Sequence, residues 1–225
     1  MNANVRGEWQ RQKRLLRKGK GEIMSDSYDS MNMIPGSITV EDCRGSRDTN
    51  IMTYQLSTMS RIYLAGTITQ QLAMDFMSVA SVLAEEQKPM EIILNTPGGE
   101  VMAGLTIYDL INSYKFPVTI YCAGYAASMG AVILAGGQKG RRFILPNSKI
   151  MIHEPLISGG LAGSASSIEK TAKNILEIKA VINKILSQHT GRSVKEINEA
   201  TLHDHFMTPE EAIEFGICDE IRSIF

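Results

Sequence analysis

Cysteine and clustered metal ligands are scarce in this 225-residue sequence, and their scarcity excludes several classes of protein. The three cysteines, Cys43, Cys122 and Cys218, are scattered, and none forms a CxxC pair. This spacing argues against a disulfide scaffold or a cysteine zinc site and is typical of a reducing cytosol, so we expect a cytoplasmic protein. The four histidines form no HExxH motif, and GGQKG at 136–140 lacks the spacing of a phosphate-binding loop. We therefore expect no metal and no cofactor in this chain.

The sequence also lacks a basic surface on its main body and a convincing membrane segment. Residues 1–20 carry seven basic side chains against one acidic, while the remainder is mildly acidic, so we expect no nucleic-acid partner. Residues 116–137 carry no charge and are long enough to be considered as a membrane span. However, this stretch contains Pro117, Gly124 and Gly130 and changes from strand-like to helix-like periodicity. A buried strand, a glycine turn and a buried helix explain it better, so we expect no membrane association.

Polarity divides the chain into an N-terminal extension and one folded domain. Residues 1–33 are polar and basic, without the apolar run of a secretory signal, so we expect a disordered extension or a propeptide there. Residues 34–225 are long enough for one α/β domain. We expect strands at 61–65, 91–95 and 117–122, and helices at 69–87, 100–114 and 128–136. This alternation predicts right-handed crossovers and a parallel sheet.

The second half of the domain shows more varied signals. A glycine- and serine-rich stretch at 157–166 is expected to be a flexible excursion. Around it we expect short strands at 142–145 and 149–153, helices at 168–189, 194–200 and 208–215, and a last strand at 219–224.

Three polar residues have the types and local settings of a hydrolytic triad. Ser128 follows a buried run and opens an apolar helix, although Ala126 stands where a GxSxG motif would have its first glycine. His153 ends an apolar strand, and its ordinary pKa of about 6.5 suits a general base. Asp204 lies in a polar cluster before a helix. Each has an ordinary alternative: a tightly packed small residue, a core histidine and a solvated loop. Together they are the groups that a serine hydrolase needs.

The turn Gly98-Gly99 follows a predicted buried strand. It can be an ordinary tight turn, since Pro-Gly pairs commonly form one. It can also let a substrate backbone approach and direct a backbone N–H at an oxyanion, because parallel sheets place their sites at this end of the strands.

The order of these motifs resembles the ClpP family, the proteolytic subunit of the ATP-dependent Clp protease. The matching segments are NTPGGEVMAGLTIYDLI, GYAASMGAVILAGGQKGRRFILPNSKIMIHEPL, HTGRS and FMTPEEAIEFGICDEI. The resemblance runs from about Ile34 to the C-terminus. It implies an α/β, ClpP/crotonase-like fold of repeated ββα units, with a protruding strand-and-helix handle at 157–189.

The resemblance also implies a serine endopeptidase that cleaves unfolded polypeptides through an acyl-enzyme. By position, Ser128 is the nucleophile, His153 is the general base and Asp204 orients the histidine. The backbone N–H groups of Gly98 and Met129 correspond to the oxyanion hole. The alternatives are a non-catalytic ring subunit of the same family and a crotonase-type acyl-CoA enzyme.

For partners, the resemblance implies a homo-oligomer: a heptameric ring, and in many members a double ring, fed by an AAA+ Clp unfoldase. The stretch 50–58 matches only loosely the family segment that helps to form the unfoldase docking pocket. Leu202 and His203 stand where the family carries an Asp-Arg pair whose arginine contributes to contacts between rings. The segment MNMIP at 31–35 resembles the start of mature members, so residues 1–30 are expected to be an extension or a propeptide.

Overall fold

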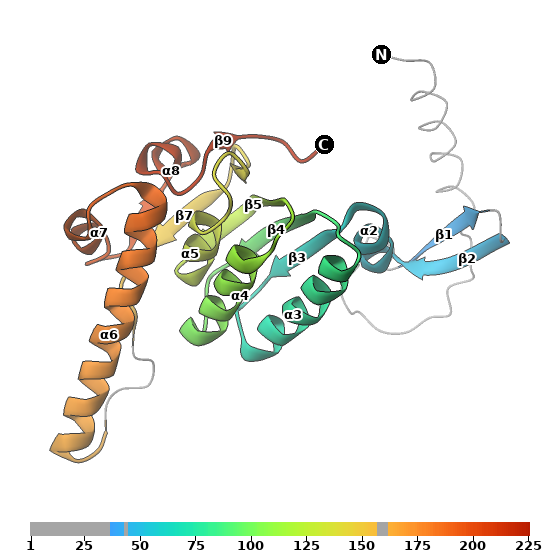
Figure 1. Cartoon of the computed structure of the whole chain (residues 1–225). Helices are drawn as coiled ribbons and strands as arrows, with labels where there is room; N and C mark the ends of the chain where they lie inside the picture. The colour runs from blue at the N-terminus through green and yellow to red at the C-terminus, as the bar shows by residue number, and fades with distance from the viewer. Residues whose placement is uncertain (1–36, 43–44, 157–161) are drawn as a thin grey trace, which may run out of the picture. The chain divides into compact units, whose positions relative to one another are not determined.

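The computed structural model describes residues 37–42, 45–156 and 162–225 (Figure 1). The chain divides into two units, the first ending at Thr58 and the second beginning at Met59. In the first unit, β1 (Ser37–Asp42) pairs antiparallel with β2 (Gly45–Asn50). Helix α2 (Ile51–Met59) follows, and the Asn50 side chain accepts a hydrogen bond from the backbone N–H of Met52 (2.8 Å). The predicted extension at 1–33 lies outside the described residues.

A seven-stranded sheet forms the centre of the second unit. Its strands are β3 (Arg61–Ala65), β4 (Met90–Thr96), β5 (Val118–Ala127), β6 (Arg142–Ile144), β7 (Lys149–Ile152), β8 (His205–Met207) and β9 (Glu220–Ile221). The order β3-β4-β5-β6-β9 is parallel throughout. Strand β7 also pairs parallel with β5, and β8 is antiparallel to β7. The predicted parallel α/β architecture is confirmed.

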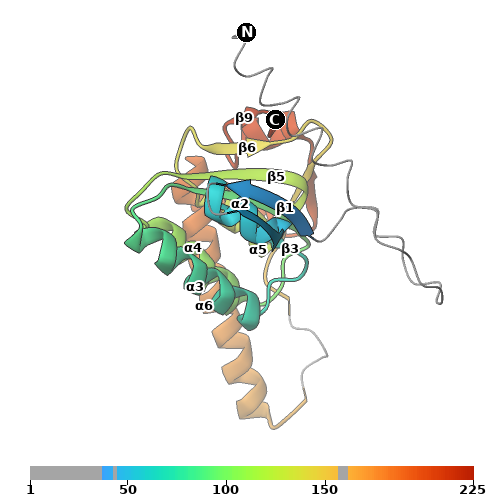
Figure 2. The same cartoon turned by 90° about the vertical axis from the view of Figure 1, so that its right-hand side faces the viewer.

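The helices follow the predicted alternation. They are α3 (Gln70–Glu85), α4 (Val101–Ser113), α5 (Met129–Ala135), α6 (Ala165–Thr190), α7 (Val194–Ala200) and α8 (Pro209–Phe215). Helices α3 and α4 lie side by side on one face of the sheet (Figure 2). Helix α3 begins after Thr69, whose side chain accepts from the Leu72 N–H, and it buries Phe76 and Leu83 at helical spacing. Every residue of α5 is buried, as its continuous apolar sequence predicts.

Several elements differ from the sequence-based expectation, among them β1, β2 and α2, which were not predicted. Strand β5 runs on through Gly124 to Ala127, five residues further than predicted, with a register shift against β4. Strand β8 was not predicted at all. Helix α6 begins at Ala165, inside the expected excursion, because the Ser164 side chain caps the Ser167 N–H.

Helix α6 corresponds to the helical part of the predicted handle. It projects beyond the rest of the second unit (Figures 1 and 2), and its buried residues all lie between Ile182 and Leu186. Residues 157–161, which would supply part of the handle's strand, lie outside the described residues. Among the helices that the structure describes, none has the length and hydropathy needed to cross a membrane.

Candidate active site

Ser128 occupies the sharp turn between β5 and α5. Its backbone angles, φ 54° and ψ −120°, lie where a residue with a side chain is rarely found. The strand holds this strained conformation, since the Ser128 N–H donates to the Met151 carbonyl (2.8 Å) and α5 begins at the next residue. The geometry resembles a nucleophile elbow, although Ala126 replaces the first glycine of that motif.

His153 reaches Ser128 because β7 lies beside β5. The register pairs Ala127 with Met151, so each strand ends at the same edge of the sheet. His153 Nε2 lies 2.8 Å from Ser128 Oγ. The histidine side chain is only 16% exposed, which holds the ring in a fixed place. The two residues therefore have the distance that proton transfer between them requires.

Asp204 directly precedes β8, a strand that was not predicted from the sequence. The antiparallel register pairs His205 with Ile152, so Asp204 lies opposite His153. Its Oδ1 is 3.4 Å from His153 Nδ1, and its side chain is 59% exposed. All three residues expected from the sequence thus lie in one line, with the imidazole between the hydroxyl and the carboxylate.

The turn after β4 lies close to Ser128. Gly98 has φ +94°, and a Cβ there would lie 2.7 Å from Ser128 Cβ, so only glycine fits. The Gly98 N–H, predicted to face an oxyanion, here donates to Thr96 Oγ1 (3.0 Å). The N–H of Gly99 has no hydrogen-bond partner among the described residues. Gly99 was not expected as a donor, because two adjacent glycines in a sequence do not indicate which of their N–H groups is free.

Met129, the other predicted oxyanion donor, is the first residue of α5. The Ser128 carbonyl accepts from Ala131 and Val132 (3.0 and 3.3 Å), so the Met129 N–H precedes the first hydrogen bonds of the helix. Within the described residues no acceptor is found for it. A free N–H one residue after the serine is positioned to meet a negative oxygen formed beside that serine.

An apolar pocket of about 20 Å³ opens beside Ser128. Its lining is Val101, Ser128, Met129, Val132, Ile152, His153, Pro155, Ile182 and Leu186. A larger cavity of about 310 Å³ lies near Arg142 and His189, and none of the three candidate catalytic residues lines it.

Tyr125 is a further residue near the site that the sequence did not single out. It lies on β5, three residues before Ser128, and is half-buried. Burial, together with the negative charge of Asp204, raises the pKa of the Tyr125 phenol. The phenol therefore stays protonated near neutral pH, within electrostatic reach of the carboxylate.

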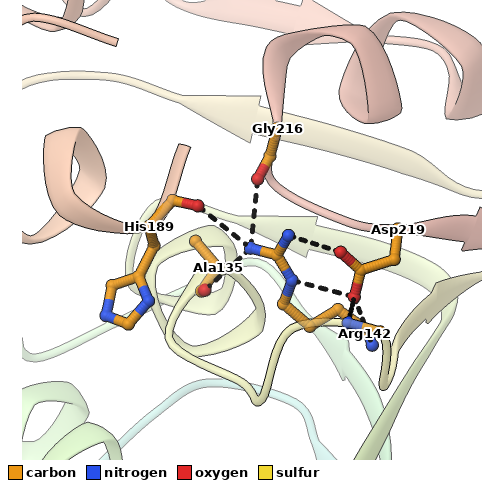
Figure 3. Close-up of polar contacts among 6 residues, drawn as sticks. Ala135, Arg142, His189, Gly216 and Asp219 are labelled. Atoms are coloured by element: carbon orange, nitrogen blue, oxygen red, sulfur yellow. Dashed lines mark hydrogen bonds and ion pairs between the residues drawn. The ribbon is translucent and has the colours of Figure 1, made fainter. Parts of the chain in front are cut away.

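Arg142 contacts the C-terminal ends of three helices, of which α5 and α6 contribute residues to the pocket beside Ser128 (Figure 3). This buried guanidinium donates to the carbonyls of Ala135, His189 and Gly216 (3.1, 3.4 and 3.0 Å), at the C-terminal ends of α5, α6 and α8. It also binds both carboxylate oxygens of Asp219. Burial tends to raise the pKa of Asp219, but the hydrogen bonds from Arg142 hold it below its ordinary value. A cation at three helix C-termini is electrostatically favourable.

His189 adds a second polar contact at the end of α6. Its Nε2 lies 2.8 Å from the Tyr108 hydroxyl on α4. Burial and the nearby charge of Arg142 lower the pKa of His189. The histidine is therefore neutral at pH 7 and links α6 to α4 without adding a second cation beside the guanidinium.

Comparison with protein families agrees with this geometry. Residues 44–224 match the model of the Clp protease family, which is most of the chain. The match covers the whole sheet, the α5 turn and α6, and it confirms the ClpP-like fold expected from the sequence. The chain belongs to the Clp protease family.

Proposed function

We propose that this chain is the serine endopeptidase subunit of a self-compartmentalised protease, and that it cleaves unfolded polypeptides through an acyl-enzyme. The observation that carries the proposal is the 2.8 Å distance between Ser128 Oγ and His153 Nε2, with the Asp204 carboxylate on the other side of the imidazole. Membership in a family of proteases supports the same reaction class. The strained backbone at Ser128 supports it further, because such strain is common at catalytic residues.

In the proposed reaction, Ser128 Oγ attacks the peptide carbonyl carbon while His153 Nε2 accepts its proton. The tetrahedral intermediate then collapses, the C–N bond breaks, and His153 gives the proton to the leaving amine. Water attacks the acyl-enzyme by the same route and releases the acid. Asp204 accepts from Nδ1–H and stabilises the imidazolium that forms in each half.

The proposed oxyanion site uses backbone N–H groups on both sides of the serine. Met129 supplies one, and the turn at Gly98-Gly99 supplies the other. We keep Gly98 as the predicted donor, and its N–H would have to leave Thr96 Oγ1 when the oxyanion forms. The free N–H of Gly99 is the alternative donor in the same turn. Either arrangement stabilises charge that appears only in the transition state.

The proposal extends to assembly. We expect a heptameric homo-oligomer in the cytoplasm, able to stack as a double ring and supplied with polypeptides by an AAA+ Clp unfoldase. Helix α6 supports an assembly because Leu176 and Val181 are exposed apolar side chains on a helix that projects from its own unit. A native mass measurement tests the ring size, and a mass of one subunit would exclude it.

Hydrolysis of a short fluorogenic peptide tests the catalytic assignment. Ser128→Ala should lower kcat by about 10⁴-fold or more, since the nucleophile is lost. The matched control is Ser113→Ala, which removes an exposed serine hydroxyl at the end of α4 and should leave kcat unchanged. If Ser128→Ala keeps the parent rate, another residue is the nucleophile. If the parent itself is inactive in its assembled state, the chain is the non-catalytic ring subunit.

A further inference from the structure

The cavity of about 310 Å³ lies at the C-terminal ends of α4, α5 and α6. It is lined by residues in the last turn of α4, in the loop after α5 and in the last turn of α6. Its volume is at the lower end of the range that small-molecule sites occupy. None of the described residues that carry the proposed peptidase mechanism lines it, so that mechanism gives this cavity no role.

The charged side chains that line the cavity are basic. Its ionisable lining residues are Lys139, Arg142 and His189, and no aspartate or glutamate of the described residues lines it. Arg142 is only 2% exposed, and its charge is balanced by Asp219, which lies outside the lining. Lys139 forms no ion pair within the described part of the chain. The cavity therefore has an unbalanced positive charge, that of Lys139.

Helix C-termini that meet at a cavity would by themselves favour a cation. Here the Arg142 guanidinium already fills that role, since it donates to the carbonyls of Ala135 and His189 at the ends of α5 and α6 (3.1 and 3.4 Å). Burial, and then the charge of Arg142, lower the pKa of His189, as expected where the positive form is disfavoured. No metal-binding cluster is found among the described residues. The electrostatics of the cavity therefore favour an anion.

Three donor groups in the lining have hydrogens without an acceptor. Arg142 Nη2 carries two hydrogens, and its one acceptor among the described residues is Asp219 Oδ1 (Figure 3). Neither the Lys139 ammonium group nor the Gln188 amide has a hydrogen-bond partner in the part of the chain that the structure describes. Because buried donors are almost always paired, the free N–H of the buried guanidinium favours a ligand with acceptor oxygens.

The lining also indicates that the ligand has an organic part. The cavity is larger than an inorganic phosphate ion, and the buried Ile111 gives it an apolar wall. Gly136 and Gly137 add lining without charged or bulky groups. A ligand with one acid group and a small apolar body matches both the basic and the apolar residues.

We propose that this cavity is a binding site for a small organic oxyanion, a phosphate monoester or a carboxylate, whose acid group contacts Arg142, Lys139 and Gln188. The bound ligand connects the ends of α4 and α6 to the loop after α5 and stabilises the second unit. The inference goes beyond the proposed peptidase function and does not depend on it.

Isothermal titration calorimetry of the full chain tests the site with three probes of similar size: phenyl phosphate, benzoate and the neutral benzyl alcohol. Ionic strength is held constant, so that screening is equal in all titrations. Phenyl phosphate, benzoate or both should bind saturably and raise Tm, whereas benzyl alcohol should do neither. The tighter of the two anions identifies the acid group that the site prefers.

Substitutions of exposed lining residues change the charge of the cavity with little risk to folding. Gln188→Glu keeps the side-chain shape but adds a carboxylate, and Lys139→Met removes the ammonium group. Each should weaken anion binding about tenfold, whereas Gln188→Lys adds a cation and should strengthen it. The matched control is Lys149→Met, which removes an exposed lysine outside the lining and should leave the affinity unchanged.

The site is overturned if neither anion binds saturably to the parent, or if benzyl alcohol binds as tightly as the anions. An affinity that is unchanged in both Gln188→Glu and Lys139→Met places the anion elsewhere and also overturns the site. If one variant fails to fold, the other two decide. Peptide hydrolysis is a separate measurement, so a failure of the proposed peptidase function leaves the outcome of these titrations unaffected.

Discussion

Removing the guanidinium of Arg142 should destabilise the second unit strongly. Arg142→Met keeps much of the side-chain volume but removes the donors to three helix-end carbonyls and to Asp219. The carboxylate is left 15% exposed without its cation. Breaking such a buried pair from one side costs about 3–5 kcal/mol. Because a whole domain has only about 5–15 kcal/mol of stability, the loss is a large fraction.

The expected change in Tm follows from the size of the domain. For about 150–250 residues, 1 kcal/mol corresponds to about 2–4 °C, so Arg142→Met should lower Tm by roughly 6–20 °C. Thermal and urea unfolding, followed by circular dichroism, measure this. Asp219→Asn and the double variant complete a cycle, and the double variant should cost less than the sum of the single ones because the two side chains are in contact.

The control for this cycle is Lys195→Met, which removes an ion pair whose side chains are 86% and 61% exposed. We expect it to change the free energy of unfolding by less than about 0.5 kcal/mol. If Arg142→Met costs no more than this control, the cluster does not hold the helix ends and the reasoning fails. A loss within the expected range supports Arg142 as the residue that anchors α5 behind the candidate nucleophile.

Three further predictions concern the site and its pH dependence. Gly98→Ala should lower kcat by at least about tenfold, because the added Cβ would collide with Ser128. The control is Gly140→Ala: Gly140 also has a positive φ but has open space around it, so this variant should lose stability and keep its kcat. Equal effects of the two variants on peptide hydrolysis would refute this. The pKa of His189 is lowered in the folded state, so protonation of this residue favours the unfolded state. Its contribution to the free energy of unfolding is therefore complete above about pH 6.5 and falls by at most about 1.4 kcal/mol per pH unit below it. His189→Gln should flatten that decline in urea unfolding between pH 6.5 and 5, and an unchanged slope would contradict the assignment. Asp204→Asn should reduce kcat for peptide hydrolysis by about 10²–10⁴-fold. We expect a reduction near 10²-fold, because the Asp204 carboxylate is exposed. A kcat equal to that of the parent would exclude Asp204 from the site.

The regular elements could be predicted because burial imposes a period on the sequence. The strand at 61–65 has the expected bounds, and α4 and α7 agree to within one residue. An apolar run marks the strand, and the capping residue Ser193 marks the start of α7. The strand and the helix predicted within 116–137 are both present as β5 and α5, but the predicted glycine turn between them is wrong, because Gly124 lies inside β5 and the turn is at Ser128. Hydrophobic periodicity is therefore sufficient for the central layers of this fold.

Strand β8 could not be predicted from local sequence. His205, Phe206 and Met207 are too few, and too polar at their start, to show an alternating pattern. They become a strand only because β7 offers an open edge to pair with. The position of Asp204 depends on that long-range pairing, so its residue type could be proposed from the sequence but its contact with His153 could not.

Arg142 was missed for a similar reason. In the sequence it follows Arg141 near a glycine turn, which is typical of an exposed basic pair. The structure buries only Arg142, because three helix ends and Asp219 converge on its guanidinium from distant parts of the chain. Such convergence of distant segments leaves no local signal in the sequence.

Covalent labelling of the assembled protein by a serine-directed phosphonate probe, with the modified peptide mapped by mass spectrometry, tests the central claim most directly. We predict a single adduct on Ser128 that forms in the parent and in Ser113→Ala. The adduct should form far more slowly in His153→Ala, because the neighbouring base is lost. An adduct on a different serine, or labelling of Ser128 at the same rate without His153, would contradict the account.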